Sequence, residues 1–369
     1  MQWESIATGC RDDYEIHIDA ARTIKRPRNI GLSSDLLAQG RWLRTLWRCW
    51  PDGVAQHFPK VHRLPTRSDN SLVLETVTGK NARLEILNGR LSAFETVAPA
   101  IRFALAVLPK LESSNETEPA RRWYSDRFMT RLKVAEALGV ASPYVFKAET
   151  VELAGSQVRN WLFAQGEDLL GVIANLHVPR VGLLHGDLHL GNILIGGGND
   201  EFHFVDPRGG FGNSLLGDVA YDVAKLLHEP HYVAVRSGLV RCRTKFKAGT
   251  WSLTPAGRHL RSVAYFRLAI FAIKSAAIAC QLLSDDADLA ARATFVAGLH
   301  FLALTDSRFL SGGQRMAFLY HGLLWTLLGE RLLSRQADFA ECMDTWQRLL
   351  LTERPTEPAH RGQALECRT

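Results

Sequence analysis

The sequence predicts an α+β protein with two lobes, a small β-rich N-terminal lobe and a large, mainly helical C-terminal lobe. Three observations predict this fold class. Residues 14–25 and 61–77 each contain two short strand-like runs separated by turn residues, and apolar and polar residues alternate in the first run, 14–18. From about Ala82 to about residue 350, apolar residues recur mainly with helical spacing. Inside this helical part, residues 181–206 contain apolar runs that predict a β-hairpin.

The N-terminal lobe is predicted from four strand-like runs and one helix. Residues 14–18 and 22–25 predict a first strand pair, and residues 61–64 and 71–77 predict a second pair around a polar turn. Between them, the sequence Ser-Ser-Asp at 33–35 is a typical N-cap, and it predicts a helix that continues to Arg48. We assign residues 1–80 to this lobe, with the connection between the lobes near residues 74–79.

The C-terminal lobe is assigned to residues 81–350 because helical periodicity dominates it. Helices are predicted at 91–108, 123–138, 151–177 and 217–227, and mainly helices from 228 to about 350. Two long apolar runs, 264–283 and 316–328, are expected to be buried core helices, since the first carries two charges and the second is too short to cross a bilayer. The tail, residues 351–369, is predicted to be disordered.

Composition places the chain among ordinary globular proteins, with 46% hydrophobic and 22% charged residues. The first residues lack a basic region followed by an apolar core, so no secretory signal is expected and the cytoplasm is the expected location. The six cysteines form no C-x-x-C pair, which indicates reduced thiols rather than a zinc site. We expect no membrane partner, and the oligomeric state is left open.

The net charge of +6 is concentrated in one region. Residues 228–330 hold twelve Lys or Arg against six Asp or Glu, and four of the basic residues cluster at 241–247. This excess is consistent with a solvated basic face, or with attraction of an anionic ligand. A nucleic-acid partner is not expected, because no nucleic-acid recognition module accompanies the charge.

The polar residues around the predicted hairpin carry the chemical signal. Asp187 and Asn192 precede its first strand and Asp206 ends its second, so the hairpin brings all three to one end. Carboxylate and amide oxygens suit Mg²⁺, and a loop carboxylate can accept the proton of a substrate hydroxyl. The D-x-x-x-x-N spacing of Asp187 and Asn192 is that of a kinase catalytic loop, and the three residues together predict phosphoryl transfer. A single loop Asp would more simply cap a turn.

Two histidines, His185 and His189, lie four residues apart in the same loop. A metal site would require them on a helix with a third ligand, so hydrogen bonding within the scaffold is the preferred interpretation. His189 is also a candidate for contact with a phosphate or with the acceptor.

A family resemblance supports this chemistry. The residues that carry it are His185-Gly186-Asp187-Leu188-His189-Leu190-Gly191-Asn192, followed by Val205-Asp206. This pattern resembles the aminoglycoside phosphotransferase and choline kinase superfamily, which has a protein-kinase-like bilobal fold. The resemblance implies Asp187 as catalytic base, Asn192 and Asp206 as magnesium ligands, and ATP as phosphate donor. It covers residues 182–227 well, the N-terminal lobe loosely, and the last hundred residues only in helical character.

The resemblance also implies supporting residues for the site. Gly217-Asp218 resembles the start of the family's next helix, where the first acid braces the catalytic loop, so Asp218 is expected to support the site together with His185. In the first lobe, Lys25 is implied as the nucleotide lysine. Gln39 lies near the position of the helix acid that should pair with that lysine, and Asp35 lies one turn earlier.

The expected nucleotide contacts continue along the first lobe. Gly9 is the one glycine in the region of the phosphate-covering loop. Residues 74–77 resemble the interlobe hinge, where backbone groups of Thr76 and Val77 would contact adenine; an ordinary edge strand is the alternative.

The segment after Asp206 departs from the family pattern, because Pro207-Arg208-Gly209 replaces a simple glycine turn. Arg208 could bind phosphate or form a salt bridge, since a guanidinium suits both roles. Similar segments in relatives near polysaccharide-synthesis genes point to a sugar substrate.

The leading hypothesis is therefore an ATP- and Mg²⁺-dependent kinase that acts on a hydroxyl of a small molecule. The basic excess disfavours polycationic acceptors and favours a neutral or anionic sugar or sugar derivative. A non-catalytic kinase-like binding module and an aminoglycoside- or choline-type kinase are the alternatives. A protein kinase is a weaker option, because no Ala-Pro-Glu segment follows Asp206.

Overall fold

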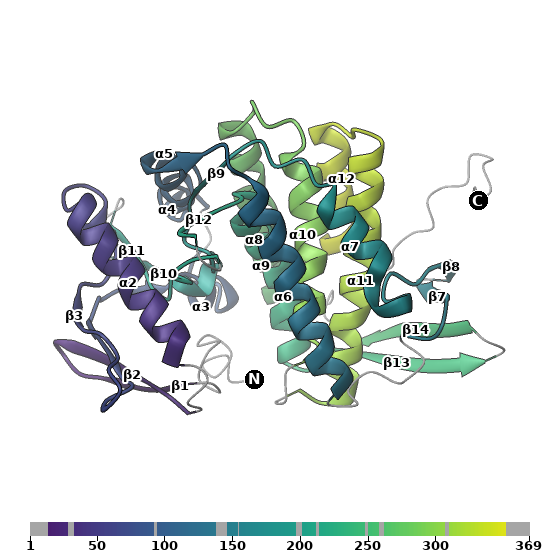
Figure 1. Ribbon diagram of the computed structural model, residues 1–369, viewed down its shortest axis with the longest axis horizontal. Coiled ribbons are helices and arrows are strands. Elements are labelled where there is room, and N and C mark those ends of the chain that lie inside the picture. The colour runs from purple at the N-terminus through teal and green to yellow at the C-terminus, as the bar shows by residue number, and fades with distance from the viewer. Residues whose placement is uncertain are drawn as a thin grey trace.

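The computed structural model describes residues 14–28, 33–91, 94–137, 146–153, 155–196, 201–211, 214–247, 250–257, 262–306 and 310–351. Gly9 and the tail beyond Leu351 lie outside the described residues. A β-rich N-terminal lobe and a larger helical lobe lie side by side (Figure 1). The prediction of an α+β, bilobal fold is confirmed.

The N-terminal lobe is a four-stranded antiparallel sheet covered by one helix. Its strands are β1 (Tyr14–Ile18), β2 (Arg22–Pro27), β3 (Val61–Arg63) and β4 (Leu72–Glu75), in the order β1-β2-β4-β3. The helix α2 (Ser33–Cys49) packs on β2, β3 and β4, and its buried Trp42, Leu43 and Leu46 join buried leucines of β4 in the core. All four strands and the helix occur where apolar periodicity predicts them.

The chain passes from β4 to the second lobe through residues 76–79. It then enters β5 (Lys80–Asn81), which pairs with β10 (Ile193–Ile195) of the predicted hairpin. The hairpin itself is confirmed, because β10 pairs antiparallel with β11 (Phe202–Phe204). The sheet order is β11-β10-β5, so the hairpin lies where the chain crosses between the lobes (Figure 1). The division of the chain at residue 80 stays a prediction.

The larger lobe is built around a helical bundle (Figure 1). Its long helices are α6 (Glu118–Ala137), α8 (Ala220–Arg236), α9 (Val263–Leu282), α10 (Leu289–Ala303), α11 (Gly312–Ser334) and α12 (Phe339–Leu351). The helix α10 packs against α6, α8 and α11, and α9 packs against α8 and α12. Large aromatic side chains such as Phe295, Phe301 and Trp325 are completely buried between them.

Shorter elements complete this lobe. The short helices are α3 (Ala82–Leu87), α4 (Ala98–Arg102), α5 (Leu108–Leu111) and α7 (Glu167–Ala174). A small sheet of order β12-β9-β6 contains β6 (Ser113–Ser114), β9 (Val181–Leu183) and β12 (Leu216–Gly217). The strand β9 leads directly into the polar loop of interest.

Two helix predictions are wrong in part. The region 91–108 is divided among a 3-10 turn, α4, a π-helical turn and the start of α5. The region 151–177 starts with a hairpin, β7 (Thr150–Leu153) and β8 (Ser156–Arg159), and becomes α-helical only at α7. Gly155 has a φ of +85°, which suits the turn of this hairpin. The apolar residues Val151 and Leu153 alternate with Glu152, a strand pattern too short to stand out against the helical surroundings.

A second hairpin replaces helix in the region after residue 228. The strands β13 (Val240–Lys247) and β14 (Thr250–Gly257) pair with each other, and β14 pairs in parallel with β7. In β13, Arg241, Arg243 and Lys245 are exposed and Cys242 is buried. The hairpin lies at the end of the molecule away from the N-terminal lobe (Figure 1). These three basic residues therefore form a solvated face.

One helix among the described residues, α9, is long and apolar enough to cross a membrane by length and composition. However, 56% of its most apolar window is buried inside the structure. It packs on α3, α4, α8 and α12. These contacts are those of a core helix, as the sequence predicts for residues 264–283.

Candidate active site

The predicted catalytic residues lie in the loop between β9 and β10, called here the 185–192 loop. The loop ends in a 3-10 turn, Leu190–Asn192, directly before β10. The backbone N–H of Val205 donates to the carbonyl of Asn192 at 3.0 Å. Asn192 and the residue after Val205, Asp206, therefore meet at one end of the hairpin, as the sequence predicts.

His185 holds the start of this loop as a neutral imidazole. Its Nε2 donates to the carbonyl of Val205 at 3.1 Å, and its Nδ1 accepts from the backbone N–H of Asp187 at 3.2 Å. The ring is completely buried, and burial lowers the pKa of His185 to about 4. The described residues contain no group of three or more His, Cys, Asp or Glu side chains that could hold a metal. His185 thus serves as scaffold.

Asp187 presents an ionised carboxylate with 23% of its side chain exposed. Its Oδ1 lies 2.8 Å from Nζ of Lys225, which comes from the helix α8. Burial raises the pKa of Asp187, but the positive charges led by Lys225 outweigh burial and hold that pKa well below its usual value. The carboxylate is therefore deprotonated at neutral pH and able to accept a proton.

The acid that braces the 185–192 loop is Asp222. Its carboxylate accepts from the backbone N–H groups of Gly186 at 3.2 Å and of Leu188 at 3.4 Å. Burial raises the pKa of Asp222 to about 7, against the lowering effect of these hydrogen bonds.

Asp218, which the sequence analysis expected in that role, is held elsewhere. It accepts from Tyr124 Oη at 3.1 Å and pairs with the buried Arg292 at 2.8 Å. It also accepts from the N–H of Ala220 at 3.0 Å. Asp218 does not bond to the 185–192 loop because it precedes α8. Asp222 lies in the first turn of that helix and faces the loop. Asp218 fixes the start of α8 and supports the site only through that helix.

A buried ion pair supports the far end of the loop. Glu229 of α8 accepts from the N–H groups of Leu190 at 2.8 Å and Gly191 at 3.3 Å, and its Oε1 lies 2.5 Å from Nε of Arg83. Both charged side chains are completely buried. The same Arg83 reaches Nδ1 of His189 at 3.0 Å. Burial and the nearby Arg83 charge lower the pKa of His189. A neutral His189 that accepts from Arg83 is part of the loop scaffold.

The predicted nucleotide lysine lies opposite the predicted metal ligand. Lys25 of β2 is buried and forms an ion pair with Asp206 across the two lobes. Its Nζ also donates to Oε1 of Gln39 at 3.4 Å, and Nε2 of Gln39 donates to the carbonyl of Pro207 at 2.8 Å. Gln39 thus occupies the position beside the lysine where the family pattern implies an acid. Asp206 has a φ of +58°, a left-handed conformation that Asp tolerates better than most residues.

The helix α2 contacts the segment after Asp206 very closely. A Cβ built on Gly209 would lie 2.4 Å from backbone atoms of Ala38 and Gln39, and its φ is +87°. Only glycine fits this contact without strain. The contact sets the distance between the helix of the first lobe and the catalytic segment of the second.

Thr76 lies in the connection between the lobes, followed by Val77. The N–H of Thr76 donates to the carbonyl of Ala21 at 3.1 Å, and its Oγ1 donates to the carbonyl of Asp19 at 3.0 Å. Both groups are used within the first lobe, and the adenine contacts expected at Thr76 and Val77 stay a prediction.

Asn192 and Asp206 offer oxygens that fit a magnesium ion. Nδ2 of Asn192 donates to the carbonyl of Asp187 at 2.9 Å, which directs the amide group and leaves Oδ1 as its acceptor. Mg²⁺ in kinase sites is held by one or two protein side chains together with phosphate oxygens and waters. This donor set is consistent with such a site.

Arg208 forms no ion pair with an acid of the described residues. Its Nε donates to the carbonyl of Gly186 at 3.2 Å, and its guanidinium lies over the rings of Trp123 at 5.5 Å and Tyr221 at 5.7 Å. The salt-bridge alternative for Arg208 is thus not observed, and contact with a phosphate or substrate stays a prediction.

Sequence reasoning missed a stripe of polar residues along α8. Asp222, Lys225 and Glu229 follow at intervals of three and four residues, so one helical face touches the whole 185–192 loop. The signal was present in the sequence, because charges at helical spacing in an otherwise apolar helix indicate a buried polar contact. Arg83 gave no such signal, since its partner Glu229 lies far along the chain.

Comparison with known proteins identifies a family whose model covers most of the site residues described above. A sequence model described as the phosphotransferase enzyme family matches residues 6–241. No curated protein sequence matches the chain.

Several solved structures are similar to this chain. A gentamicin–APH(2")-IIa complex is 12% identical, covering 85% of this chain and 98% of that chain, with a TM-score of 0.42. Choline kinase from Cryptosporidium parvum is 9% identical, covering 91% and 98%, with a TM-score of 0.43. Aminoglycoside phosphotransferase APH(3'')-Id from Streptomyces rimosus is 16% identical, covering 73% and 96%, with a TM-score of 0.35.

The family match spans more than half of the chain, and it includes the 185–192 loop, the β10–β11 hairpin and α8. It agrees with the resemblance identified from the sequence motif. The chain belongs to the phosphotransferase enzyme family.

Proposed function

We propose that this phosphotransferase moves the γ-phosphate of ATP to a hydroxyl of a small molecule, with Mg²⁺ as cofactor. The observation that carries the proposal is the meeting of Asp187, Asn192, Asp206 and Lys25 from three separate segments of the chain. A metal-binding acid, a metal-binding amide, a phosphate-binding lysine and a base are the parts that phosphoryl transfer requires.

In the proposed reaction, the 185–192 loop provides the base. The acceptor oxygen bonds to the γ-phosphorus as the bond from that phosphorus to the β–γ bridging oxygen breaks, and Asp187 takes the hydroxyl proton. Lys225 stabilises the ionised form of Asp187 before the reaction. Asp222 and Glu229 hold the loop backbone in place through four hydrogen bonds. Base assistance of this kind contributes about 10²–10⁴-fold to rate.

The nucleotide side of the proposal involves both lobes. Asn192 and Asp206 would hold Mg²⁺, which when bound neutralises charge on the phosphate oxygens. Lys25, released from Asp206, would bind the phosphates. Residues 1–80 would form the nucleotide lobe, with Thr76 and Val77 beside adenine and Gly9 near the phosphates.

We infer a neutral or anionic sugar, or a sugar derivative, as acceptor. The support comes from charge. Burial raises the pKa of Asp187; Lys225 and Arg208 are the permanently charged side chains that lower it, and both are basic. A polycationic acceptor would be repelled there.

A non-catalytic nucleotide-binding module is the second candidate, and Gln39 favours it. A neutral amide beside Lys25 gives that lysine less electrostatic support than the expected acid would. An aminoglycoside- or choline-type kinase is the third, through the family membership.

The test is a screen of sugars, sugar acids, sugar phosphates, amino alcohols and aminoglycosides, with ADP release and product mass as readouts. We expect turnover with at least one sugar or sugar derivative. In Asp187→Asn, kcat should fall about 10²–10⁴-fold while nucleotide binding persists. Nucleotide binding without turnover of any acceptor would favour the binding module, and turnover confined to aminoglycosides or choline would favour the third candidate.

A further inference from the structure

Two arginines lie over one indole ring beside the 185–192 loop, and one of them also lies over the ring of a tyrosine. The guanidinium groups of Arg127 and Arg208 lie 5.8 Å and 5.5 Å from the ring centre of Trp123. Arg208 also lies 5.7 Å from the ring of Tyr221. Arg127 comes from α6, Tyr221 from α8, and Arg208 from the segment after Asp206. Three parts of the chain thus bring two positive charges to one place.

Two buried polar groups of this cluster lack protein partners. Nε of Arg127 and Oη of Tyr221 are buried and form no hydrogen bond. Only 1% of Tyr221 is exposed. No acid of the described residues forms an ion pair with Arg127 or Arg208. Buried polar groups are normally paired, so a set of unpaired donors at one point requires an explanation.

The acids near this cluster act on its guanidinium groups at a distance and form no ion pair with them among the described residues. Asp187 is close enough to act electrostatically on Arg127, Arg208 and Tyr221, but Lys225 already pairs with it. Burial, followed by repulsion from Arg208, lowers the pKa of Arg127 to about 10, which leaves it charged at neutral pH. Burial lowers the pKa of Arg208, but Tyr221, Asp187, Asp35 and Asp222 together raise it above its ordinary value. An anion from outside the chain would give the two guanidinium groups the direct partner that they lack among the described residues.

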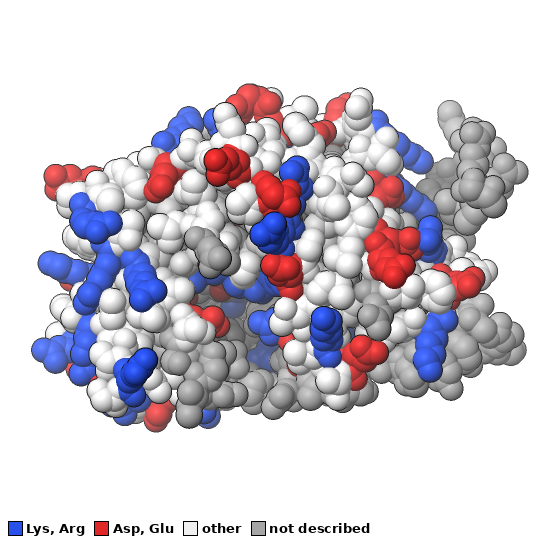
Figure 2. Space-filling view, in the orientation of Figure 1, with Lys and Arg blue, Asp and Glu red and all other residues white. Residues whose placement is uncertain are grey.

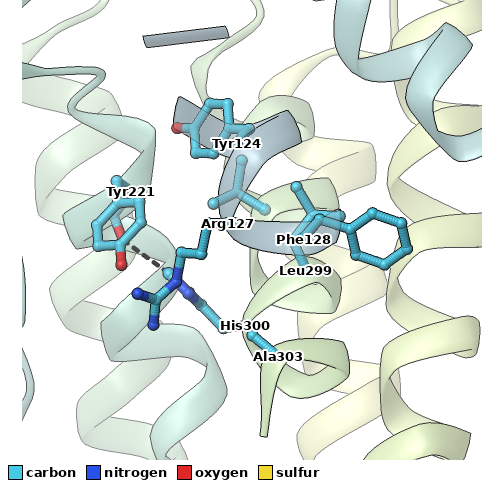
Figure 3. A pocket seen from close by; sticks show the side chains of 8 residues that line it. Tyr124, Arg127, Phe128, Tyr221, Leu299, His300 and Ala303 are labelled. Atoms are coloured by element: carbon cyan, nitrogen blue, oxygen red, sulfur yellow. Dashed lines mark hydrogen bonds between the residues drawn. The ribbon is translucent and has the colours of Figure 1, made fainter. Parts of the chain in front are cut away.

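The cluster lies on the helical side of the site. Arg127 and Tyr221 line a small pocket together with Tyr124, Phe128, Leu299 and His300, all from α6, α8 and α10. Figure 3 shows the Arg127 guanidinium beside the Tyr221 hydroxyl and the His300 ring, whose Nε2 bonds to the carbonyl of Tyr221. Figure 2 shows Lys and Arg side chains in the hollow between the lobes. Lys25, the expected nucleotide lysine, belongs to the other lobe.

We propose that Arg127, Arg208 and Tyr221 form an anion-binding subsite for the acceptor, so that the substrate is a hydroxyl compound carrying a carboxylate or phosphate. This inference rests on the proposed function and narrows its substrate class. Guanidinium groups bind both kinds of anion through paired hydrogen bonds, and the free Tyr221 hydroxyl adds a third donor. The Nε of Arg208 bonds to Gly186, directly before Asp187, so the same side chain links the anion to the base.

The anion that binds at this subsite could instead be the γ-phosphate of the nucleotide. A subsite for the acceptor and a subsite for the γ-phosphate differ in how anion binding responds to a bound nucleotide. An acceptor subsite binds phosphate or a sugar acid in the presence of a nucleotide. A γ-phosphate subsite loses its anion when a non-hydrolysable ATP analogue binds.

The experiment uses the full chain and two readouts. Calorimetry first measures binding of inorganic phosphate and of a sugar acid to the nucleotide-free protein and to the protein saturated with the ATP analogue. Kinetics then compare kcat/KM for matched acceptors, a sugar and its uronic acid or phosphate. The variants are Arg127→Met and Tyr221→Phe, with Arg122→Met as control, because Arg122 is an exposed arginine on the same helix.

We expect anion binding with and without the analogue, weakened about tenfold or more in Arg127→Met and unchanged in Arg122→Met. The kcat/KM ratio of anionic over neutral acceptor should fall by a similar factor. Tyr221→Phe should weaken binding less, and because it removes only an unbonded hydroxyl it should fold normally.

Three results would overturn the subsite. They are no anion binding to the wild type, equal binding in Arg127→Met, or complete displacement by the ATP analogue. Because the binding readout requires no turnover, failure of the subsite is distinguishable from failure of the proposed function, which would appear as anion binding without phosphorylation of any acceptor.

Discussion

Lys225 decides the charge state of Asp187. Burial pushes the Asp187 carboxylate toward its protonated form, and the ammonium group at 2.8 Å reverses that effect. Lys225 does not belong to the 185–192 loop and acts on the proposed reaction only through Asp187. We therefore regard it as a positioning residue that keeps the base ready at neutral pH.

Lys225→Met should move the acid limb of the pH–kcat profile to higher pH. Without the lysine, burial raises the pKa of Asp187, so a larger fraction of the base is protonated at any given pH. The measurement is kcat against pH at saturating ATP and acceptor, with Lys133→Met, an exposed lysine of α6, as control. An unchanged acid limb in Lys225→Met would show that Lys225 does not set the charge of Asp187.

At the scale of elements, α8 is the platform of the site. Its stripe of Asp222, Lys225 and Glu229 supports the loop from end to end, and Glu229 in turn requires the buried Arg83. A buried ion pair is strongly destabilising when one partner is removed, because the other charge remains without compensation. The catalytic loop thus depends on a pair of charges that do not contact the substrate.

Glu229→Gln should lower the free energy of unfolding by about 3–5 kcal/mol, as typical for one partner of a buried pair. The glutamine side chain also has one acceptor oxygen where the carboxylate has two, so its NH₂ group would face a donor of Arg83 or of the loop backbone. The double variant Arg83→Met with Glu229→Leu should recover only part of this loss, because it removes the unpaired charge but leaves the N–H groups of Leu190 and Gly191 without their acceptor. Urea unfolding measures both stabilities. As a control, Arg90→Gln breaks the pair of the exposed Arg90 with Glu85 and should leave the free energy of unfolding nearly unchanged. A similarly small effect of Glu229→Gln would contradict the buried-pair interpretation.

Prediction from sequence succeeded where the information is local. The strands of the first lobe, the helix α2 and the β10–β11 hairpin follow from periodicity and from turn or cap residues next to them. The sequence analysis did not predict β7 and β13 as strands. Both pair with β14, and the pairing of β7 with β14 joins segments that are distant in sequence. In the site, Asp187, Asn192 and Asp206 were found by a motif. Arg127 and Arg83 were not, because only the fold brings them to the loop.

For the whole molecule, the described residues of the two lobes meet in two places: the ring of His57 stacks on Phe202 of β11, and α2 and β2 contact Asp206 and the segment after it. Lys25 meets Asp206, Gln39 meets Pro207, and the backbone of α2 meets Gly209. The proposed nucleotide lysine and the proposed metal-binding acid come from different lobes, so we expect their alignment to depend on this contact. A change that moves α2 outward should disturb both at once.

Gly209→Ala is the matching test. The added Cβ would collide with the backbone of Ala38 and Gln39, and alanine is strained at a φ of +87°. We expect a lower Tm and a higher KM for ATP, measured by thermal unfolding and initial rates. Gly171→Ala is the control, since a Cβ there meets nothing within 4 Å in α7 and should stabilise the helix by about 0.5–1 kcal/mol. If KM for ATP is unchanged in Gly209→Ala, the contact does not align the nucleotide site.

The ion pair between Lys25 and Asp206 has a consequence for the order in which the site is filled. Each partner is the expected ligand of a different component, the lysine of the nucleotide phosphates and the acid of the metal. Binding of either component alone must separate the pair and leave one charge without its counterpart. When nucleotide and Mg²⁺ bind together, the ion pair is separated only once, and the phosphates and the metal then neutralise the charges of Lys25 and Asp206. Nucleotide should therefore raise the affinity for Mg²⁺, and by thermodynamic reciprocity Mg²⁺ should raise the affinity for nucleotide by the same factor.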